Sequence, residues 1–252
     1  MIDQPRETRV LDAVVSLVDS LLDDFDIVDL LTELTERCAE LLDIDAAGFL
    51  LADPLHQLRL LAATSEQARE LELFQLQADE GPCVDCYATG QPVSIADIHL
   101  ATGRWPRIVP AAVGAGFASV HAVPMRAAGM VLGALGLFGA HPGELTEADL
   151  LVGQPLTHIA CVALLREQPP THATVMPQLR SALTGRVIIE QAKGFLRETL
   201  DVSLEEAFRL LRTYARAKGQ HLTDVARSLM TDRHSRPALV AELAELAAGP
   251  RR

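Results

Sequence analysis

Several features are scarce or missing in this chain of 252 residues. Only 4% of its residues are aromatic, with one Trp and two Tyr, and it has four cysteines. The chain opens with a polar, acidic stretch, which is unlike a signal peptide. The long apolar region 108–143 is interrupted by prolines and glycines, so it lacks the run of about 20 apolar residues that a membrane span needs. We therefore expect a cytoplasmic protein with reduced thiols and no membrane partner.

Catalytic motifs are also missing. The eight histidines are scattered, and no Ser-His-Asp set, paired carboxylates or phosphate-binding loop can be named. We expect no enzyme activity and no metal site. Cys83-x-x-Cys86 leaves three readings open: structural or pocket-lining thiols, a redox pair, and a metal site. A start of a helix at Cys83 would lower the pKa of its thiol and favour the redox reading. A zinc site would need four ligands, but Cys38 and Cys161 lie in distant apolar helix patterns.

Charge is divided unevenly along the chain. Residues 1–175 have 9 Lys/Arg against 25 Asp/Glu, whereas residues 176–236 have 11 against 7, within a total net charge of −12. Local positive charge attracts phosphates, and the acidic remainder discourages non-specific nucleic-acid binding. The basic surplus is modest, so binding to nucleic acid would also need shape and specific contacts.

The basic segment predicts three helices. In the first, 186–196, apolar residues form one arc, and Arg186, Lys193 and Arg197 share the other face with Glu190 among them. The second helix starts at Ser203-Leu-Glu-Glu206, which has the pattern of a capping box, and stops at Gly219. The third covers roughly 222–230. A charged helix face is usually just solvated, but here two helices have the same basic bias in an otherwise acidic chain.

Four stretches of this segment resemble the ANTAR domain. They are Arg186-Val-Ile-Ile-Glu-Gln-Ala-Lys-Gly-Phe-Leu196, Ser203-Leu-Glu-Glu-Ala-Phe208, Leu211-Arg-Thr-Tyr-Ala215 and Leu222-Thr-Asp-Val-Ala226. Arg197 departs from the family, which usually has Met there. The resemblance implies a three-helix RNA-binding module of bacterial transcription antiterminators. It also implies a target RNA with two small stem-loops, engaged by a pair of modules, with RNA polymerase affected only indirectly.

Basic side chains would then contact RNA phosphates, and two other side chains would contact bases. Gln191 has an amide that can hydrogen-bond a base edge, and Tyr214 has a ring that can stack on a loop base, although Tyr214 fits a core position equally well. The expected phosphate contacts are Arg186, Lys193, Arg209, Arg212 and Arg216.

The acidic part of the chain has the pattern of an α+β domain. We expect helices at 10–23, 27–43, 65–73, 83–88 and 104–114, strands at 46–52, 58–63, 74–77, 93–96, 117–124 and 130–139, and a last helix that starts at Thr146-Glu-Ala-Asp149 and runs to Arg166. The first helix has a wide apolar arc, which suits a partner chain as well as an ordinary core.

This order resembles a GAF domain, an antiparallel sheet flanked by helices. Gly81-Pro-Cys83, Gly90-Gln-Pro-Val93 and the hairpin Ser119-Val-His-Ala-Val-Pro124 with Leu132-Gly-Ala-Leu-Gly-Leu-Phe138 resemble the version that precedes ANTAR domains in actinobacterial regulators. The resemblance implies an unidentified small ligand or a role in dimerisation, with Cys83, Trp105 and His121 as pocket residues. No other cofactor is expected.

The expected organisation is an α+β GAF-like sensor domain followed by an all-α, three-helix ANTAR domain. The boundaries are 1–168 for the GAF-like domain with its N-terminal helix, 169–176 for the linker, 177–236 for the ANTAR domain, and 237–252 for a C-terminal helix and tail. We expect a homodimer that regulates transcription in response to a signal. Two alternatives stay open: a GAF-dimerised DNA- or protein-binding regulator, and a ligand-independent scaffold in which a filled GAF domain only pairs RNA-binding modules.

Overall fold

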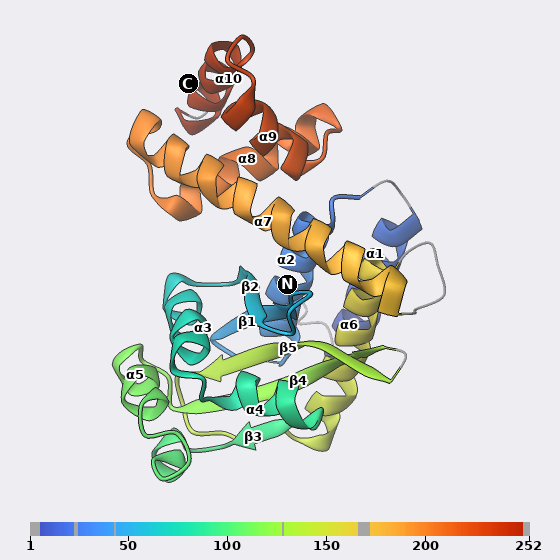
Figure 1. Ribbon diagram of the computed structural model, residues 1–252, viewed down its shortest axis with the longest axis vertical. Coiled ribbons are helices and arrows are strands. Elements are labelled where there is room, and N and C mark those ends of the chain that lie inside the picture. Colours follow the sequence, from blue (N-terminus) through green and yellow to red (C-terminus); the bar gives the residue numbers. More distant parts are fainter. Residues whose placement is uncertain (1–5, 23–24, 43, 128, 166–171, 249–252) are drawn as a thin grey trace. The chain divides into compact units, whose positions relative to one another are not determined.

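The computed structural model describes the chain apart from residues 1–5, 23–24, 43, 128, 166–171 and 249–252 (Figure 1). It divides into two compact units, Met1–Arg180 and Ser181–Arg252. The first unit contains a sheet with helices, and the second contains helices. The elements are α1 (Arg6–Leu22), α2 (Ile27–Leu42), β1 (Ala46–Ala52), β2 (Leu58–Ala63), α3 (Glu66–Ala78), α4 (Pro82–Thr89), β3 (Val93–Ile95), the 3-10 helix η1 (Ile98–Ala101), α5 (Ile108–Gly114), β4 (Ser119–Ala127), β5 (Met130–Gly139), α6 (Glu147–Leu164), α7 (His172–Leu200), α8 (Leu204–Lys218), α9 (Leu222–Thr231) and α10 (Arg236–Ala247).

The sheet of the first unit is antiparallel throughout, with the strand order β2-β1-β5-β4-β3. Its central strands are buried on both faces: all seven residues of β1 are buried. In the β1–β5 pair, Gly48 lies directly opposite Gly136. Because two facing glycines have no side chains, they leave a depression in the sheet where another side chain can approach the backbone closely.

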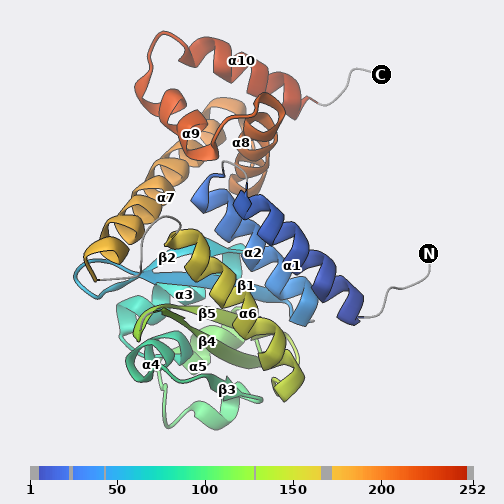
Figure 2. The same cartoon turned by 90° about the vertical axis from the view of Figure 1, so that its right-hand side faces the viewer.

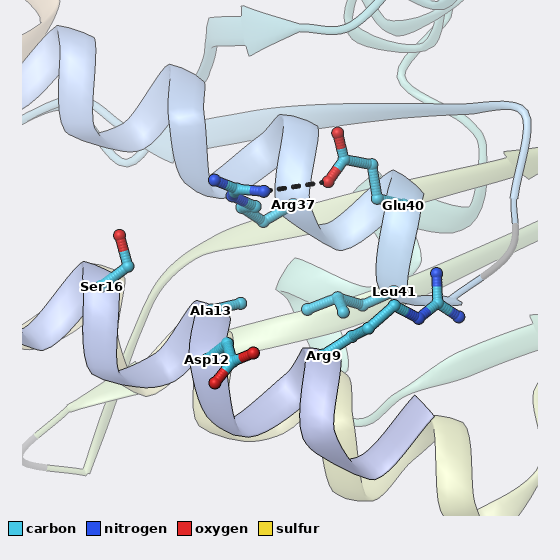
Figure 3. A pocket seen from close by; sticks show the side chains of 7 residues that line it. All are labelled: Arg9, Asp12, Ala13, Ser16, Arg37, Glu40 and Leu41. Atoms are coloured by element: carbon cyan, nitrogen blue, oxygen red, sulfur yellow. Dashed lines mark hydrogen bonds and ion pairs between the residues drawn. The ribbon is translucent and has the colours of Figure 1, made fainter. Parts of the chain in front are cut away.

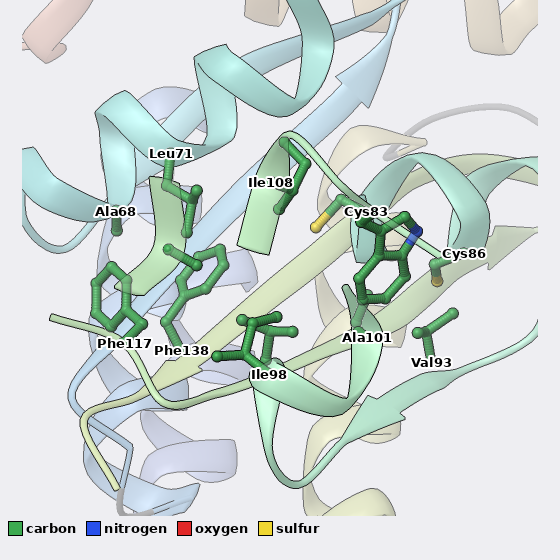
Figure 4. Close-up of a cluster of buried hydrophobic side chains, with 14 of the residues drawn as sticks. Ala68, Leu71, Cys83, Cys86, Val93, Ile98, Ala101, Ile108, Phe117 and Phe138 are labelled. Carbon is green, nitrogen blue, oxygen red and sulfur yellow. The ribbon is translucent and has the colours of Figure 1, made fainter. Parts of the chain in front are cut away.

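Helices cover both faces of this sheet. α2 and α6 pack on one face, and α1 packs on α2 and α6, as Figure 2 shows. α3 and α4 pack on the other face, where α3 also contacts α5, and α5 contacts η1. The buried side chains on this second face form one cluster that includes Ala68, Cys83, Ile98, Ile108 and Phe138 (Figure 4). The α+β architecture predicted from the sequence is confirmed.

The sequence pattern Thr-x-x-acid marks the observed start of α6. The Thr146 hydroxyl accepts a hydrogen bond from the Asp149 amide at 3.2 Å, and the Asp149 carboxylate accepts one from the Thr146 amide at 2.8 Å. This capping box is reciprocal, as Thr-x-x-acid predicts. Asp149 also pairs with Arg6, which ties the start of α1 to the start of α6.

Two predicted elements of the first unit are wrong. The strand expected at 74–77 belongs to α3, in which Leu71, Glu72 and Gln75 are buried at helical spacing. Four residues of alternation are too short to separate a strand from the end of a helix. The helix expected at 104–114 begins only at Ile108. Trp105 precedes Pro106, and a residue before proline avoids the helical conformation.

The second unit packs α8, α9 and α10 against one another. Gly219 ends α8 in the left-handed conformation, with φ of 60°, as predicted. α7 starts at His172, so the part of the predicted linker 169–176 that is described is helical, and residues 169–171 lie outside the described residues. Among the residues described, no helix is long and apolar enough to cross a membrane.

Candidate functional site

On the predicted basic side of α7, the carboxylate of Glu190 bridges two cations. Glu190 Oε1 lies 2.6 Å from Arg186 Nη2 and 2.8 Å from Lys193 Nζ. Lys193 is only 8% exposed, and its ammonium lies 5.7 Å from the ring centroid of Phe208 on α8. The expectation of an open basic face was therefore wrong for Lys193, which sits at the edge of the buried face. A helical wheel gives the direction of Lys193 but not the neighbouring helix that covers it.

The three arginines of α8 share one face of the helix. Arg209, Arg212 and Arg216 lie within about 60° of one another at 100° per residue. Arg209 and Arg216 are exposed and Arg212 is half-buried. Their spacing covers roughly 10 Å at 1.5 Å per residue. We call this surface the arginine face of α8. Its positive charge and its length along the helix axis suit the phosphates of one nucleic-acid strand.

Only half of the predicted capping box forms at the start of α8. The Ser203 hydroxyl accepts a hydrogen bond from the Glu206 amide at 3.0 Å. The Glu206 carboxylate does not reach back to the cap, because both of its oxygens accept hydrogen bonds from the Arg209 guanidinium, with Nε–Oε2 at 2.7 Å. This bidentate pair lowers the pKa of Glu206 and raises that of Arg209. A predicted phosphate contact is thus already engaged by a carboxylate.

Of the two predicted base contacts, Gln191 is on another helix and Tyr214 is on another side of α8. Gln191 is exposed on α7. Tyr214 is half-buried on α8, about 200° round the helix from both Arg212 and Arg216. On α8, the structure therefore separates Tyr214 from the three predicted phosphate contacts. It leaves the arginine face as the coherent candidate site of the second unit.

The predicted ligand residues of the first unit are also separated. Cys83 is fully buried in the cluster that Figure 4 shows, and Trp105, 1% exposed, belongs to the same cluster. Trp105 donates a hydrogen bond from Nε1 to Asp85 Oδ2 at 3.1 Å. Both side chains are packed core residues, and sequence spacing alone could not show how closely the core fills around them.

His121 lies on the other face of the sheet. Its neighbours Val120 and Ala122 belong to the cluster with Cys83, so alternation along β4 turns His121 away from it. His121 Nδ1 lies 2.8 Å from Ser94 Oγ on the paired strand β3. Burial lowers the pKa of His121 to about 4, which keeps the imidazole neutral. His121 is a satisfied core histidine on its own side of the sheet.

A buried carboxyl group beside Cys83 was missed in the sequence. Glu72 is fully buried, and it accepts hydrogen bonds from Gln75 Nε2 at 3.0 Å and from the Cys83 thiol at 3.4 Å. It lies over the facing pair Gly48 and Gly136: a Cβ on Gly48 would be 2.7 Å from Glu72 Oε1. A lone acidic residue in a helix gives no signal of this contact, because the two glycines come from distant strands.

Burial controls the ionisation of this cluster. It raises the pKa of Glu72 to about 8, although the hydrogen bond from Cys83 opposes the shift. Burial and the neighbouring Glu72 raise the pKa of Cys83, and burial raises that of Cys86 to about 12. The lowered pKa that favoured a redox role for Cys83 is therefore contradicted, because burial outweighs the helix start. Among the described residues, no group of three or more His, Cys, Asp or Glu side chains is placed to hold a metal ion.

A groove between α1 and α2 was also not predicted. It has a volume of about 390 Å³. Figure 3 shows its lining, with the Arg37–Glu40 pair, 3.2 Å long, on the α2 side. The lining residues are Arg9, Asp12, Ala13, Ser16, Arg37, Glu40 and Leu41. The groove mixes both signs of charge and is separate from the buried cluster around Cys83, because the two share no residue.

Comparison with known families covers both units. Residues 177–230 match the ANTAR domain model, and residues 26–164, more than half of the chain, match a GAF domain model. The chain is a GAF–ANTAR protein. ANTAR domains are RNA-binding antitermination modules, and GAF domains bind small ligands or mediate dimerisation. α10 lies beyond the ANTAR match, and α1 lies before the GAF match.

Two solved structures are similar to part of this chain. Free methionine-R-sulfoxide reductase from Neisseria meningitidis, solved with its substrate, has a TM-score of 0.50 and 17% identity over 71% of this chain and 95% of that chain. The GAF domain of a phosphoenolpyruvate-protein phosphotransferase from Coxiella burnetii has a TM-score of 0.49 and 19% identity over 63% and 95%. At 17% identity, the likeness to the reductase concerns the fold alone. No curated protein matches this GAF–ANTAR chain.

Proposed function

We propose that this GAF–ANTAR protein acts as a homodimer that binds one RNA with two stem-loops and promotes transcription antitermination. Two ANTAR domains would each hold one stem-loop, and the held structure would prevent formation of the competing terminator. The observation that carries this proposal is the arginine face of α8, which lies within the ANTAR match. Arginine suits this role because its guanidinium binds phosphate oxygens in a bidentate manner.

In this proposal the arginine face of α8 contacts the RNA, and the cations of α7 stabilise the fold of the ANTAR domain. Arg212 and Arg216 would contact phosphates of the RNA strand directly. Lys193 and Arg186, held by Glu190, would stabilise the packing of α7 rather than meet the RNA. Gln191 remains the exposed candidate for a base contact.

Titration of fluorescent RNA separates this function from its alternative. The purified full-length protein is added to a dual stem-loop RNA, to the same RNA with altered loop sequences, and to duplex DNA, across a salt series. We expect tight binding that needs intact loops and that falls about 10-fold or more for the double variant Arg212→Ala, Arg216→Ala. Lys193→Ala should instead lower the melting temperature. Equal, weak binding to all three probes would contradict RNA recognition and favour a DNA- or protein-binding regulator.

Homodimerisation is supported by an apolar stripe on the outer side of α1. Leu11 and Val15 are 65% and 57% exposed, and Val18 continues the stripe at the i+7 position from Leu11. On α6, which contacts α1, Leu151 and Val162 are exposed as well. Spacings of four and three residues give the seam by which two helices pair. A second copy of this chain would cover the stripe.

Sedimentation velocity tests this pairing. The double variant Leu11→Glu, Val15→Glu should shift the protein from dimer to monomer, since it buries charge in the expected seam. Leu55→Glu is the matched control, because Leu55 is exposed on the turn between β1 and β2, away from α1. Dimers of unchanged stability in the double variant would exclude α1 as the interface.

The packed core supports pairing as the main role of the GAF unit. Cys83 and Trp105 are buried members of one core cluster, and we propose that this unit acts without catalysis and without a resident cofactor. The groove between α1 and α2 offers a surface site for an unidentified small ligand. We further propose that the protein works in the cytoplasm, where nascent transcripts are found, and that it affects RNA polymerase only through the RNA.

A further inference from the structure

α10 is a helix that this chain adds to the matched ANTAR domain. It packs on α8 and α9 through the buried side chains of Leu239 and Leu243. Its first residue, Arg236, donates hydrogen bonds from Nε to the Leu229 carbonyl and from Nη2 to the Met230 carbonyl, both at 2.6 Å. These carbonyls end α9, so Arg236 caps one helix while it starts the next. α10 is therefore firmly attached at its start and along its buried side.

On α10, Glu242 meets two side chains of α8. Its Oε2 lies 2.7 Å from Lys218 Nζ, and Lys218 Nζ lies 5.4 Å from the ring centroid of Tyr214. Lys218 first, and then the hydrogen bond from the Tyr214 hydroxyl, lower the pKa of Glu242 and keep it ionised. The Lys218 and Glu242 side chains are 50% and 46% exposed. The three groups thus form a small polar site that solvent and ligands can reach.

Tyr214 and Lys218 have the chemistry of a nucleotide site. They lie four residues apart and so one turn apart on the same side of α8. An aromatic ring stacks on any base of single-stranded RNA, and an ammonium next to it binds the phosphate of that nucleotide. The carboxylate of Glu242 lies against the ammonium of Lys218 in the way that a phosphate oxygen would.

We infer that Tyr214 and Lys218 form a second RNA-contact site, for an unpaired nucleotide, and that Glu242 occupies this site as a phosphate mimic until RNA displaces it. This inference rests on the proposed function and adds a site that faces away from the arginine face of α8. RNA would have to reach both sides of α8, as a loop can and a straight duplex cannot. Glu242 would then select for RNAs whose loop offers a free nucleotide.

The exchange needs only a side-chain movement. An ion pair between half-exposed groups contributes little to stability, so a phosphate can replace the carboxylate without release of α10. Leu239, Leu243 and the Arg236 cap are not part of the site and stay in place. We call the Glu242 carboxylate in this position the mask. It should weaken RNA binding by a small factor rather than abolish it.

A pair of charge-matched variants tests the mask. Glu242→Gln and Glu245→Gln each remove one negative charge from α10, but Glu245 is exposed and is not part of the Tyr214–Lys218 contact. Binding of the dual stem-loop RNA is measured for both full-length variants by fluorescence anisotropy. We expect Glu242→Gln to bind about 3- to 5-fold more tightly than Glu245→Gln. Far-UV circular dichroism and melting curves confirm that both variants keep α10 folded.

Two further measurements identify the groups involved. In the Glu242→Gln background, Tyr214→Ala should remove the gain in affinity, because the stacking ring is lost. The plot of log K against log salt should be steeper for Glu242→Gln than for Glu245→Gln by about 0.7, the value for one additional phosphate contact in single-stranded RNA.

The outcomes separate this inference from the proposed function. If all variants bind the RNA, and Glu242→Gln binds no more tightly than Glu245→Gln, the mask is disproved while RNA binding stands. Weaker binding of Glu242→Gln would also overturn it, because Glu242 would then position Tyr214 for RNA. If no variant prefers the stem-loop RNA to duplex DNA, the proposed function fails and this inference fails with it.

Discussion

Glu72 of the GAF unit and two glutamates of the ANTAR unit are held in opposite ways. In the GAF unit, Glu72 is buried with an amide and a thiol as partners, and its pKa rises to about 8. In the ANTAR unit, Glu206 and Glu242 lie at the surface, each bonded to a cation, and their pKa values fall. The first arrangement keeps an acid neutral, and the second keeps acids charged.

The buried glutamate and the surface glutamates therefore affect different properties of the protein, namely packing and surface charge. The carboxyl of Glu72 fills space over two glycines, so its volume and its protonation state matter to the stability of the fold. The carboxylates of Glu206 and Glu242 fill no buried space and instead set how much positive charge α8 presents. Substitutions in the first group should change stability, whereas substitutions in the second should change RNA affinity.

The largest expected effect comes from filling the space that Glu72 uses. A Cβ on Gly136 would meet Glu72 Oε1 and would lie 2.8 Å from Cys83 Sγ. We expect Gly136→Ala to lower the free energy of unfolding by about 1–3 kcal/mol, as overpacking does in cores, measured by urea denaturation. Gly143→Ala is the control, because a Cβ there meets nothing within 4 Å. Adding Glu72→Ala to Gly136→Ala should recover part of the loss; no recovery would mean that Glu72 does not cause the strain.

The next effect is a dependence of stability on pH. Folded Glu72 keeps its proton up to about pH 8, whereas the unfolded chain loses it near pH 4.5. The folded state thus binds more protons between these values, and stability must fall as the pH rises through this window. His121 has the opposite effect, because its pKa is lowered from 6.5 to about 4 in the folded state. Between these values the unfolded chain binds a proton that folded His121 does not, so stability falls as the pH falls.

Glu72→Gln isolates the contribution of the carboxyl. The amide has nearly the same shape and cannot ionise, so the variant should gain stability over the parent protein at pH 8 and little or none at pH 5. Urea midpoints at both pH values measure the difference. Glu70→Gln on the exposed side of α3 is the control. A gain of the same size at both pH values would show that Glu72 is not protonated in the fold.

The smallest expected effect concerns the surface pair of α8. Glu206→Gln frees Arg209 from its bidentate partner, so binding to the dual stem-loop RNA should strengthen about 2- to 4-fold more than for Glu205→Gln. Glu205 is exposed in the same turn and matches the charge change. Anisotropy at low salt measures both. Equal affinities would mean that Arg209 does not contact RNA and serves only the start of α8.

Local patterns predicted much of the fold. The reciprocal cap at Thr146 and the left-handed Gly219 depend on residues close in sequence, so their signals could be read directly. Long apolar runs at 46–52 and 130–139 predicted the central strands at their observed bounds. The recognition of GAF and ANTAR domains, which depended on such local motifs, is confirmed.

Competing local contacts and contacts between distant residues could not be predicted in the same way. Lys193 lies on the expected basic side of its helix, but Phe208 of the next helix covers it. Glu206 fits a capping box by spacing, yet the nearby guanidinium of Arg209 competes successfully for its carboxylate. Glu72 gives no local signal at all, since the space that it fills is defined by two strands far along the chain.

The facing glycines also have a consequence for the evolution of this chain. Positions 48, 72 and 136 share one small volume, although they come from two strands and a helix. A larger residue at position 48 or 136 can be accepted only together with a shorter one at position 72. Among descendants of this sequence, these three positions should therefore change together, and a trio of small, large and small residues should be inherited as a unit.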